Sequence, residues 1–186
     1  MTDEDATTAT GAVEIELSRA ELRTVTGYAV ACAEPSLAFY ERECPGDPRP
    51  RAAIEAAREF AEGAGRTKLL RDRAWAAHRA AQETRDAGQL LASDAARAAA
   101  HACGAAYLHP LAKATQVRHI LSSAAHTARA YERVADGDPA VGAGHVARFA
   151  ALTPHGVADV LRRYPAAPPG GGRVGALIRE LDAALR

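Results

Sequence analysis

The chain has 186 residues, of which 48% are hydrophobic and 5% aromatic, and its 23 basic and 23 acidic side chains leave no formal net charge. This length predicts a single domain with a core of its own. Because aromatic residues are scarce, alanine must supply much of the packing. A neutral chain lacks the basic excess with which proteins bind nucleic acid or anionic lipid, so we expect neither as a partner. No apolar stretch is long enough to span a membrane.

The cysteines and the first residues indicate the compartment. Cys32, Cys44 and Cys103 are odd in number and far apart, which is typical of reduced thiols in a cytoplasm rather than of disulfides. Cys103 lies near His101 and Tyr107 but has no evident pair of base and orienting group, which predicts a buried side chain without a catalytic role. The acidic N-terminal residues lack the apolar segment of a secretory signal. We therefore expect a cytoplasmic protein.

Residues 1–17 are predicted to form a flexible lead-in, because they are polar and rich in threonine. Apolar residues alternate with glutamates over 13–17 as in a strand, but this stretch is too short to build a sheet. The first helix should follow directly, since Ser18 and Glu21 have the spacing of a capping box.

Helix-breaking residues divide the first third of the chain. Pro35 lacks an amide hydrogen, so the first helix must end or kink near Glu34, and a short second helix should follow it. Pro45-Gly46 predicts a turn before a third helix. Gly63 has the position of a cap that ends this third helix.

Three longer helices are predicted in the middle of the chain. Thr67 can cap a helix that runs to about Asp86. An alanine-rich helix follows over about 89–108, and His109-Pro110 breaks it. The stretch 111–136 has a continuous apolar face at helical spacing, and we expect it to be the central helix.

The helical pattern weakens towards the C-terminus. Short helices are predicted over 145–152 and 153–164, and 165–173 has the composition of a Pro/Gly linker. The amphipathic helix 174–186 either packs on the bundle or binds another molecule, for example a second copy in a homodimer. We therefore predict an all-α, alanine-rich multi-helix bundle of roughly seven helices, with its main domain over 18–164.

A polar seam runs along the predicted central helix, opposite its apolar face. Its members follow one another at steps of three or four residues: Thr115, His119, Ser122, His126, Arg129 and Arg133. His119 and His126 are about 10 Å apart along the helix axis, too far to bind one metal ion unless their side chains converge.

Histidines are the only serious candidates for chemistry. A metal site would need ligands from several helices, and its candidates are His78, His101, His109, His119 and His126. Acidic ligands are scarce beside them, so a structural role is favoured: hydrogen bonds between helices for His78 and His101, and a solvated seam for His119 and His126. We predict no catalytic residue, metal or cofactor. A metal-dependent enzyme or small-ligand-binding protein that uses these histidines stays as the alternative.

A second charged group lies at the start of the third helix. Asp47, Arg49 and Arg51 can form a contact surface; equally, Asp47 can cap the helix while the arginines pair with carboxylates of adjacent helices. The candidate partner-binding residues are Asp47, Arg49, Arg51, His119, His126 and Arg129.

The same region resembles a known family. The residues that carry the resemblance are 47–54 (DPRPRAAI), which run on to Arg58 and end at Gly63, then 32–34 (CAE), 74–81 (AWAAHRAA), and His101, His109 and His119 before Ala124-Ala125. Together these residues resemble the Imm-5-like putative immunity proteins, an all-helical bacterial family, over roughly residues 20–135.

The resemblance implies a function but no chemistry. Such families are grouped with bacterial polymorphic toxin systems, in which a cytoplasmic immunity protein binds and blocks a cognate toxin. It implies a protein toxin as the partner and brings no catalytic residues. A two-metal nuclease would need a cluster of carboxylates, and the sequence contains no convincing one.

Overall fold

The computed structural model describes residues 13–186, so residues 1–12 of the predicted lead-in lie outside it. Its helices are α1 (Arg19–Ala33), α2 (Leu37–Glu43), α3 (Arg49–Ala61), α4 (Lys68–Asp86), α5 (Leu90–Ala105), α6 (Val117–Val134), α7 (Pro139–Ala151), α8 (His155–Arg162) and α9 (Gly172–Leu185). The described residues form the predicted all-α bundle. It has somewhat more than the roughly seven helices expected, and the short α2 and α8 lie where separate short helices were predicted.

Local signals place several helix ends as predicted. The Ser18 side chain accepts a hydrogen bond from the Glu21 amide, and the Glu21 carboxylate accepts one from the Ser18 amide, which completes the capping box of α1. The α1 helix ends at Ala33, and Pro35 lies in a 3-10 turn before α2. Thr67 caps α4 by accepting a hydrogen bond from the Leu70 amide.

Two helix starts differ from the prediction. The central helix α6 begins at Val117 and not at residue 111, because residues 110–112 are extended beside the lead-in. There the Ile15 amide donates to the Pro110 carbonyl and the Ala112 amide to the Val13 carbonyl, both at 2.8 Å. These backbone groups are therefore not available to a helix.

The second difference is α7, which begins at Pro139 instead of residue 145. Asp138 caps it by accepting from the Ala140 amide, and proline at the first helical position needs no hydrogen-bond partner. Two glycines in its first turns weaken the helical pattern in the sequence. One of them, Gly142, packs directly against the Glu132 side chain and leaves no room for a Cβ atom.

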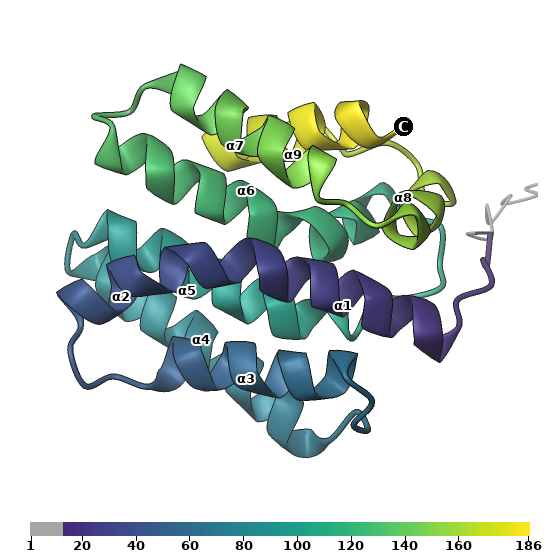
Figure 1. The fold of residues 1–186 in the computed structure, drawn as a ribbon, viewed down its shortest axis with the longest axis horizontal. Helices are drawn as coiled ribbons and strands as arrows, with labels where there is room; N and C mark the ends of the chain where they lie inside the picture. Colours follow the sequence, from purple (N-terminus) through teal and green to yellow (C-terminus); the bar gives the residue numbers. More distant parts are fainter. Residues whose placement is uncertain (1–12) are drawn as a thin grey trace, which may run out of the picture.

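The helices are arranged in three levels (Figure 1). The α1 and α5 helices cross the middle of the molecule, α3 and α4 lie on one side of them, and α6 lies on the other side with α7 and α9 against it. The short α8 packs against one end of α1. The α5 and α6 helices, which run side by side, therefore connect the two halves of the bundle.

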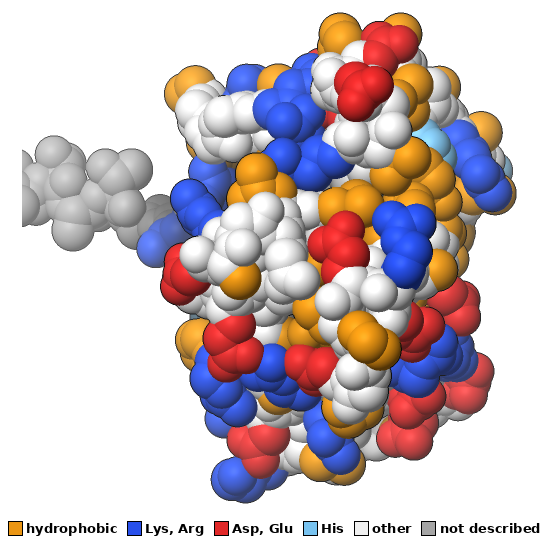
Figure 2. Space-filling model, turned by 90° about the vertical axis from the view of Figure 1, so that its left-hand side faces the viewer, with side chains coloured by type: hydrophobic (Ala, Val, Ile, Leu, Met, Phe, Trp, Pro, Cys, Tyr) orange, Lys and Arg blue, Asp and Glu red, His pale blue; other side chains and the backbone are white. Residues whose placement is uncertain are grey.

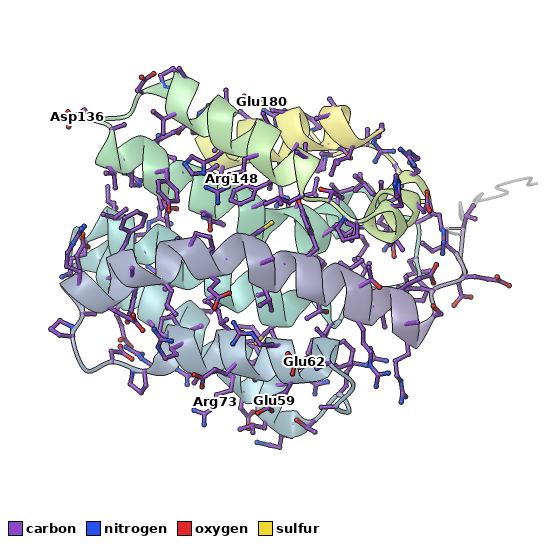
Figure 3. All side chains as sticks on the ribbon, in the orientation of Figure 1. Glu59, Glu62, Arg73, Asp136, Arg148 and Glu180 are labelled. Carbon is purple, nitrogen blue, oxygen red and sulfur yellow. The ribbon has the colours of Figure 1, made fainter. Side chains whose placement is uncertain are left out.

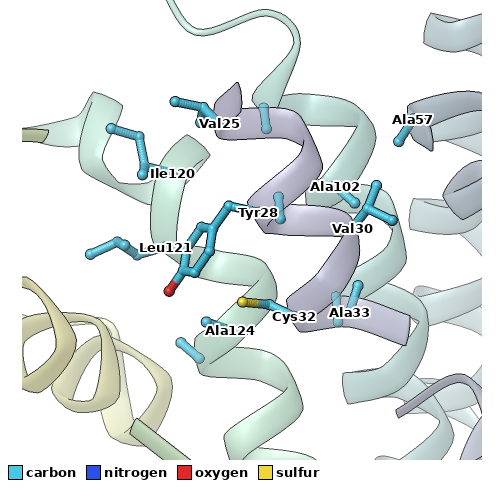
Figure 4. Packing of buried hydrophobic residues seen from close by; sticks show 14 of the residues in the cluster. Val25, Tyr28, Val30, Cys32, Ala33, Ala57, Ala102, Ile120, Leu121 and Ala124 are labelled. Carbon is cyan, nitrogen blue, oxygen red and sulfur yellow. The ribbon is translucent and has the colours of Figure 1, made fainter. Parts of the chain in front are cut away.

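Alanine makes this close packing possible. The buried side chains of α5 are mostly alanines, and the Ser123 hydroxyl of α6 reaches the Ala98 carbonyl of α5 at 2.9 Å. Larger side chains fill the space between α1 and α6, where Tyr28 lies beside Leu121 (Figure 4). Each fully buried leucine or isoleucine there stabilises the fold by about 1.5–3 kcal/mol relative to an exposed one.

The α9 helix packs back on the bundle. Leu177 and Leu181 are fully buried, and α9 contacts both α6 and α7. The segment before α9 is also held, since the Ala167 amide donates to Asp182 and the Arg179 guanidinium to the Gly170 carbonyl. The apolar face of this helix is therefore covered within the chain.

No helix among residues 13–186 is both long enough and apolar enough to cross a bilayer.

Candidate functional site

Three of the candidate histidines meet, each from a different helix. His78 of α4 contacts His101 of α5 edge-to-face, with ring centroids 5.3 Å apart, and His101 stacks on His126 of α6 at 5.5 Å. Trp75, whose ring centroid lies 6.0 Å from that of His78, extends this row to the surface. His78 and His101 thus contact through their rings, where hydrogen bonds were expected.

The rings stack instead of directing nitrogens at one point. No group of three or more His, Cys, Asp or Glu side chains in the described part of the chain can hold a metal ion. His109 is occupied elsewhere, where its Nδ1 accepts from the Leu111 amide at 3.1 Å. Burial lowers the pKa of His78, His101 and His119, so these rings favour the neutral form.

An acidic partner of the seam comes from another helix. Asp94 of α5 is buried, with 6% of its surface exposed, and lies 2.9 Å from the Nδ1 of His126 and 2.5 Å from the Nε of Arg133. Burial opposes ionisation of Asp94, but the hydrogen bonds from His126 and Arg133 hold its pKa below the usual value. Because the ionised carboxylate only accepts, the His126 Nδ1 carries the proton.

A basic cleft opens beside this group. It has a volume of about 650 Å³, and α5, α6 and the start of α9 form its walls. The basic side chains that line it are Arg85, Arg97, His101, Arg118, His126, Arg129, Arg133 and Arg173. Asp94 is the only carboxylate among the described residues that line it, and Leu90, Val174 and Ile178 add apolar surface. We call this feature the arginine cleft.

A second buried carboxylate fixes the α9 wall of the arginine cleft. Glu132 of α6 is fully buried and forms ion pairs with Arg129 at 2.7 Å and with Arg173 of α9 at 2.6 Å. Gly142 of α7 packs directly against the Glu132 side chain, and a Cβ atom there would overlap its carboxylate. The ion pairs and the packing of Gly142 therefore join α6, α7 and α9 at one point.

The charged group at the start of α3 is held within the chain. Asp47 accepts from the Arg49 guanidinium and from the Tyr40 hydroxyl, both at 2.7 Å. Arg49 also pairs with Glu83 of α4, and Arg51 pairs with a glutamate of α2. These contacts join α2, α3 and α4, and none of the three candidates from this group lines the arginine cleft.

The structure thus divides the candidate partner-binding residues. His126 and Arg129 line the arginine cleft, whereas His119 lies beside Gly104 of α5 and leaves its buried Nδ1 without a partner in the described residues. Among the charged residues that line the cleft, sequence reasoning missed Asp94 and Arg97 of α5, Arg85 of α4, Arg118 of α6 and Arg173 of α9. One signal was available, because Asp94 and Arg97 are isolated charges in an alanine-rich helix.

On the face shown in Figure 2, acidic and basic side chains are interspersed. The charges that cancel in the neutral chain are therefore mixed on this face and not separated into one acidic and one basic patch.

These features define an alanine-rich, all-helical protein with a basic cleft between its helices. The chain belongs to the Imm-5 like putative immunity protein family, whose model matches residues 16–134. The match ends at the last residue of α6, so α7, α8 and α9 lie outside it. No curated protein and no solved structure matches the chain.

Proposed function

We propose that this protein is a cytoplasmic immunity protein that binds a cognate bacterial toxin and blocks it without catalysing a reaction. The observation that carries the proposal is membership of the family, since the family model covers α1 to α6. The alternative was a metal-dependent enzyme or a small-ligand-binding protein that uses the histidines. The histidine rings pack on one another and, in the described residues, do not converge with other side chains on a metal ion, so they do not support the metal-dependent form of this alternative.

The surface that best fits a protein partner lies on α3 and α4, within the matched residues. Trp75 projects from α4 with 60% of its surface exposed, although tryptophan is costly to leave in water. Tryptophan and arginine are the residue types that most often dominate protein–protein binding energy. We infer that Trp75 contacts the toxin. Arg49 and Arg51 at the start of α3 stay candidates, although both are ion-paired within the chain. His126 and Arg129 form the second candidate surface.

The proposal is tested in two steps: a pull-down of the chain from its native cytosol to identify a toxin-like partner, and then titration of that partner with the chain. A blocking protein should abolish toxin activity at one equivalent, and the toxin should recover its activity and unchanged mass after denaturing separation. Inactivation by far less than one equivalent, or a toxin of altered mass, would show catalysis. Full toxin activity at a large excess of the chain would contradict the immunity function itself.

The contact surface is tested separately. We expect Trp75→Ala to weaken toxin binding by about 2 kcal/mol or more, because truncating a central aromatic residue typically costs this much. Leu152→Ala is the matched control, since Leu152 is a similarly exposed apolar residue (58%) on the unmatched side of the chain. Equal effects of the two substitutions would place the contact elsewhere, and His126→Ala would then test the second surface.

A further inference from the structure

The arginine cleft contains more positive charge than its carboxylates can balance. Arg133 pairs with Asp94, and Arg129 and Arg173 pair with the buried Glu132. The other three arginines of the cleft, Arg85, Arg97 and Arg118, take part in none of the ion pairs formed among residues 13–186. They come from α4, α5 and α6, so three helices direct unbalanced guanidinium groups to one cavity.

Arg97 is the half-buried member of this set, whereas Arg85 and Arg118 are exposed. A half-buried charge is less screened than one in water, and Arg97 contributes to lowering the pKa of His101, after burial and the neighbouring histidines. An anion in the cleft would balance these charges. Guanidinium groups bind phosphate and carboxylate oxygens through two parallel hydrogen bonds, which makes arginine the preferred residue for this purpose.

The glycine-rich turn before α9 adds to the same wall. Gly170, Gly171 and Gly172 all have positive φ, and Gly171, the N-cap of α9, has no side chain to bond the amides of the first helical turn. Gly171 lines the cleft, and the Arg118 guanidinium lies 3.8 Å from where its Cβ would be. Backbone amides at a helix start favour anions, so they supplement the arginines here.

The size and lining of the cleft indicate the kind of anion. A volume of about 650 Å³ is within the range of small-molecule sites. Three unbalanced charges call for a ligand with several negative charges, and each phosphate group carries up to two. The apolar side chains of Leu90, Val174 and Ile178 can contact an uncharged part of such a ligand.

We propose that the arginine cleft binds a small organic anion that carries two or more phosphate groups. Arg97 and Arg118 would hold the phosphates, and the first turn of α9 would contribute backbone amides. The proposal goes beyond toxin binding, because one wall of the cleft comes from α9, outside the residues that the family model matches.

Calorimetric titration of the full chain with pyrophosphate and with adenosine triphosphate tests whether the arginine cleft binds phosphate groups. We expect one molecule of at least one probe to bind per chain, with affinity that falls as salt rises, and no binding of uncharged adenosine. Arg97→Gln and Arg118→Gln should each weaken binding at least tenfold. Arg73→Gln is the control, because Arg73 projects from the α3–α4 edge of the molecule, remote from Glu180 on α9 (Figure 3).

Unchanged helicity and melting temperature of the variants would show that they fold. Failure of both phosphate probes to bind, or equal weakening by Arg73→Gln, would overturn the proposal. A hexaglutamate peptide that binds more tightly than either probe, and loses binding in the same two variants, would also overturn it in favour of an acidic protein segment. Because the toxin is absent from these titrations, their outcome is independent of the immunity function.

Discussion

Glu132 is a carboxylate inside the protein, with none of its surface exposed. Removing a charge from water costs several kcal/mol unless partners replace the lost solvation. Here both oxygens are satisfied, one by Arg129 and the other by Arg173. Replacement of Gly142, which packs against Glu132, tests how much these ion pairs contribute to the free energy of unfolding.

Gly142→Ala should lower the free energy of unfolding by about 2–3 kcal/mol. The added methyl group would force the Glu132 carboxylate away from its arginines, and overpacking of a filled site typically costs this amount. Gly144→Ala, on the same helix with no atom within 4 Å of the new Cβ, should be neutral or stabilising by up to about 1 kcal/mol. Urea denaturation measures both, and equal effects would contradict the packing role of Gly142.

The stacked histidines predict how stability depends on pH. Burial, followed by His126 and His78, lowers the pKa of His101 well below 6.5 in the folded chain. As pH falls, the unfolded chain therefore takes up a proton that the folded chain does not, and stability is lost. For this side chain alone the loss between pH 7.5 and 5.5 is at most about 1.4 kcal/mol, the limit reached if the folded ring stays neutral over this range.

His101→Gln should therefore reduce the loss of stability between these two pH values, by up to about 1.4 kcal/mol. His155→Gln is the control, since His155 is exposed at the start of α8, and it should keep the full pH dependence. Unfolding curves at both pH values give the comparison. A pH dependence that His101→Gln leaves unchanged would show that His101 is not the group that titrates.

At the scale of elements, α9 completes the bundle and the arginine cleft together. Its leucines fill the surface left by α6 and α7, while Arg173 in its first turn reaches Glu132. The position of the cleft wall therefore depends on apolar packing along the rest of the helix.

Leu181→Ala should cost about 2–5 kcal/mol of unfolding free energy, because Leu181 is fully buried and the remaining cavity adds to the lost hydrophobic contact. Leu69→Ala, at an exposed leucine of α4 (52%), should change stability by less than about 0.5 kcal/mol. Thermal or urea unfolding of the two variants measures these changes in stability. A small effect of Leu181→Ala would mean that α9 is only loosely attached.

At the scale of the whole molecule, the cysteines report on global unfolding. Burial raises the pKa of Cys32 and of Cys103 to about 12, and the Cys103 thiol also donates to the Ala53 carbonyl at 3.0 Å. Cys44 is only partly buried. Thiolate is the reactive form, so the two buried thiols should react only after the bundle opens.

Iodoacetamide at pH 8 should therefore label Cys44 alone in the folded chain, slowly because burial also raises its pKa. All three cysteines should react in denaturant. Mass spectrometry of the digested protein identifies the labelled positions. Rapid labelling of Cys32 without denaturant would show that α1 separates from the core more readily than the packing indicates.

The sequence predicted helices best where a local signal fixes their ends. Ser18, Pro35 and Thr67 act on the backbone within a few residues, so their effects can be read without knowing the fold. The start of α6 was predicted wrongly because residues 110–112 bond to the distant lead-in, a contact with no local signature.

The candidate site was predicted only in part for the same reason. His126 and Arg129 were found because they repeat at helical spacing on one helix. Asp94, Arg97 and Arg173 were missed because they lie on other helices and are joined to the seam only by packing.

By itself, the sequence determined the all-α class, most helix boundaries, the apolar face of α6 and the family to which the chain belongs. These properties follow from hydrogen bonding, side-chain periodicity and motifs within short stretches. Only the tertiary structure decided that the seam faces α5 and α9 rather than open solvent, and that arginines from four helices share one cleft. Long-range packing determines which charges become neighbours, because it alone brings residues 94, 118 and 173 to the same place.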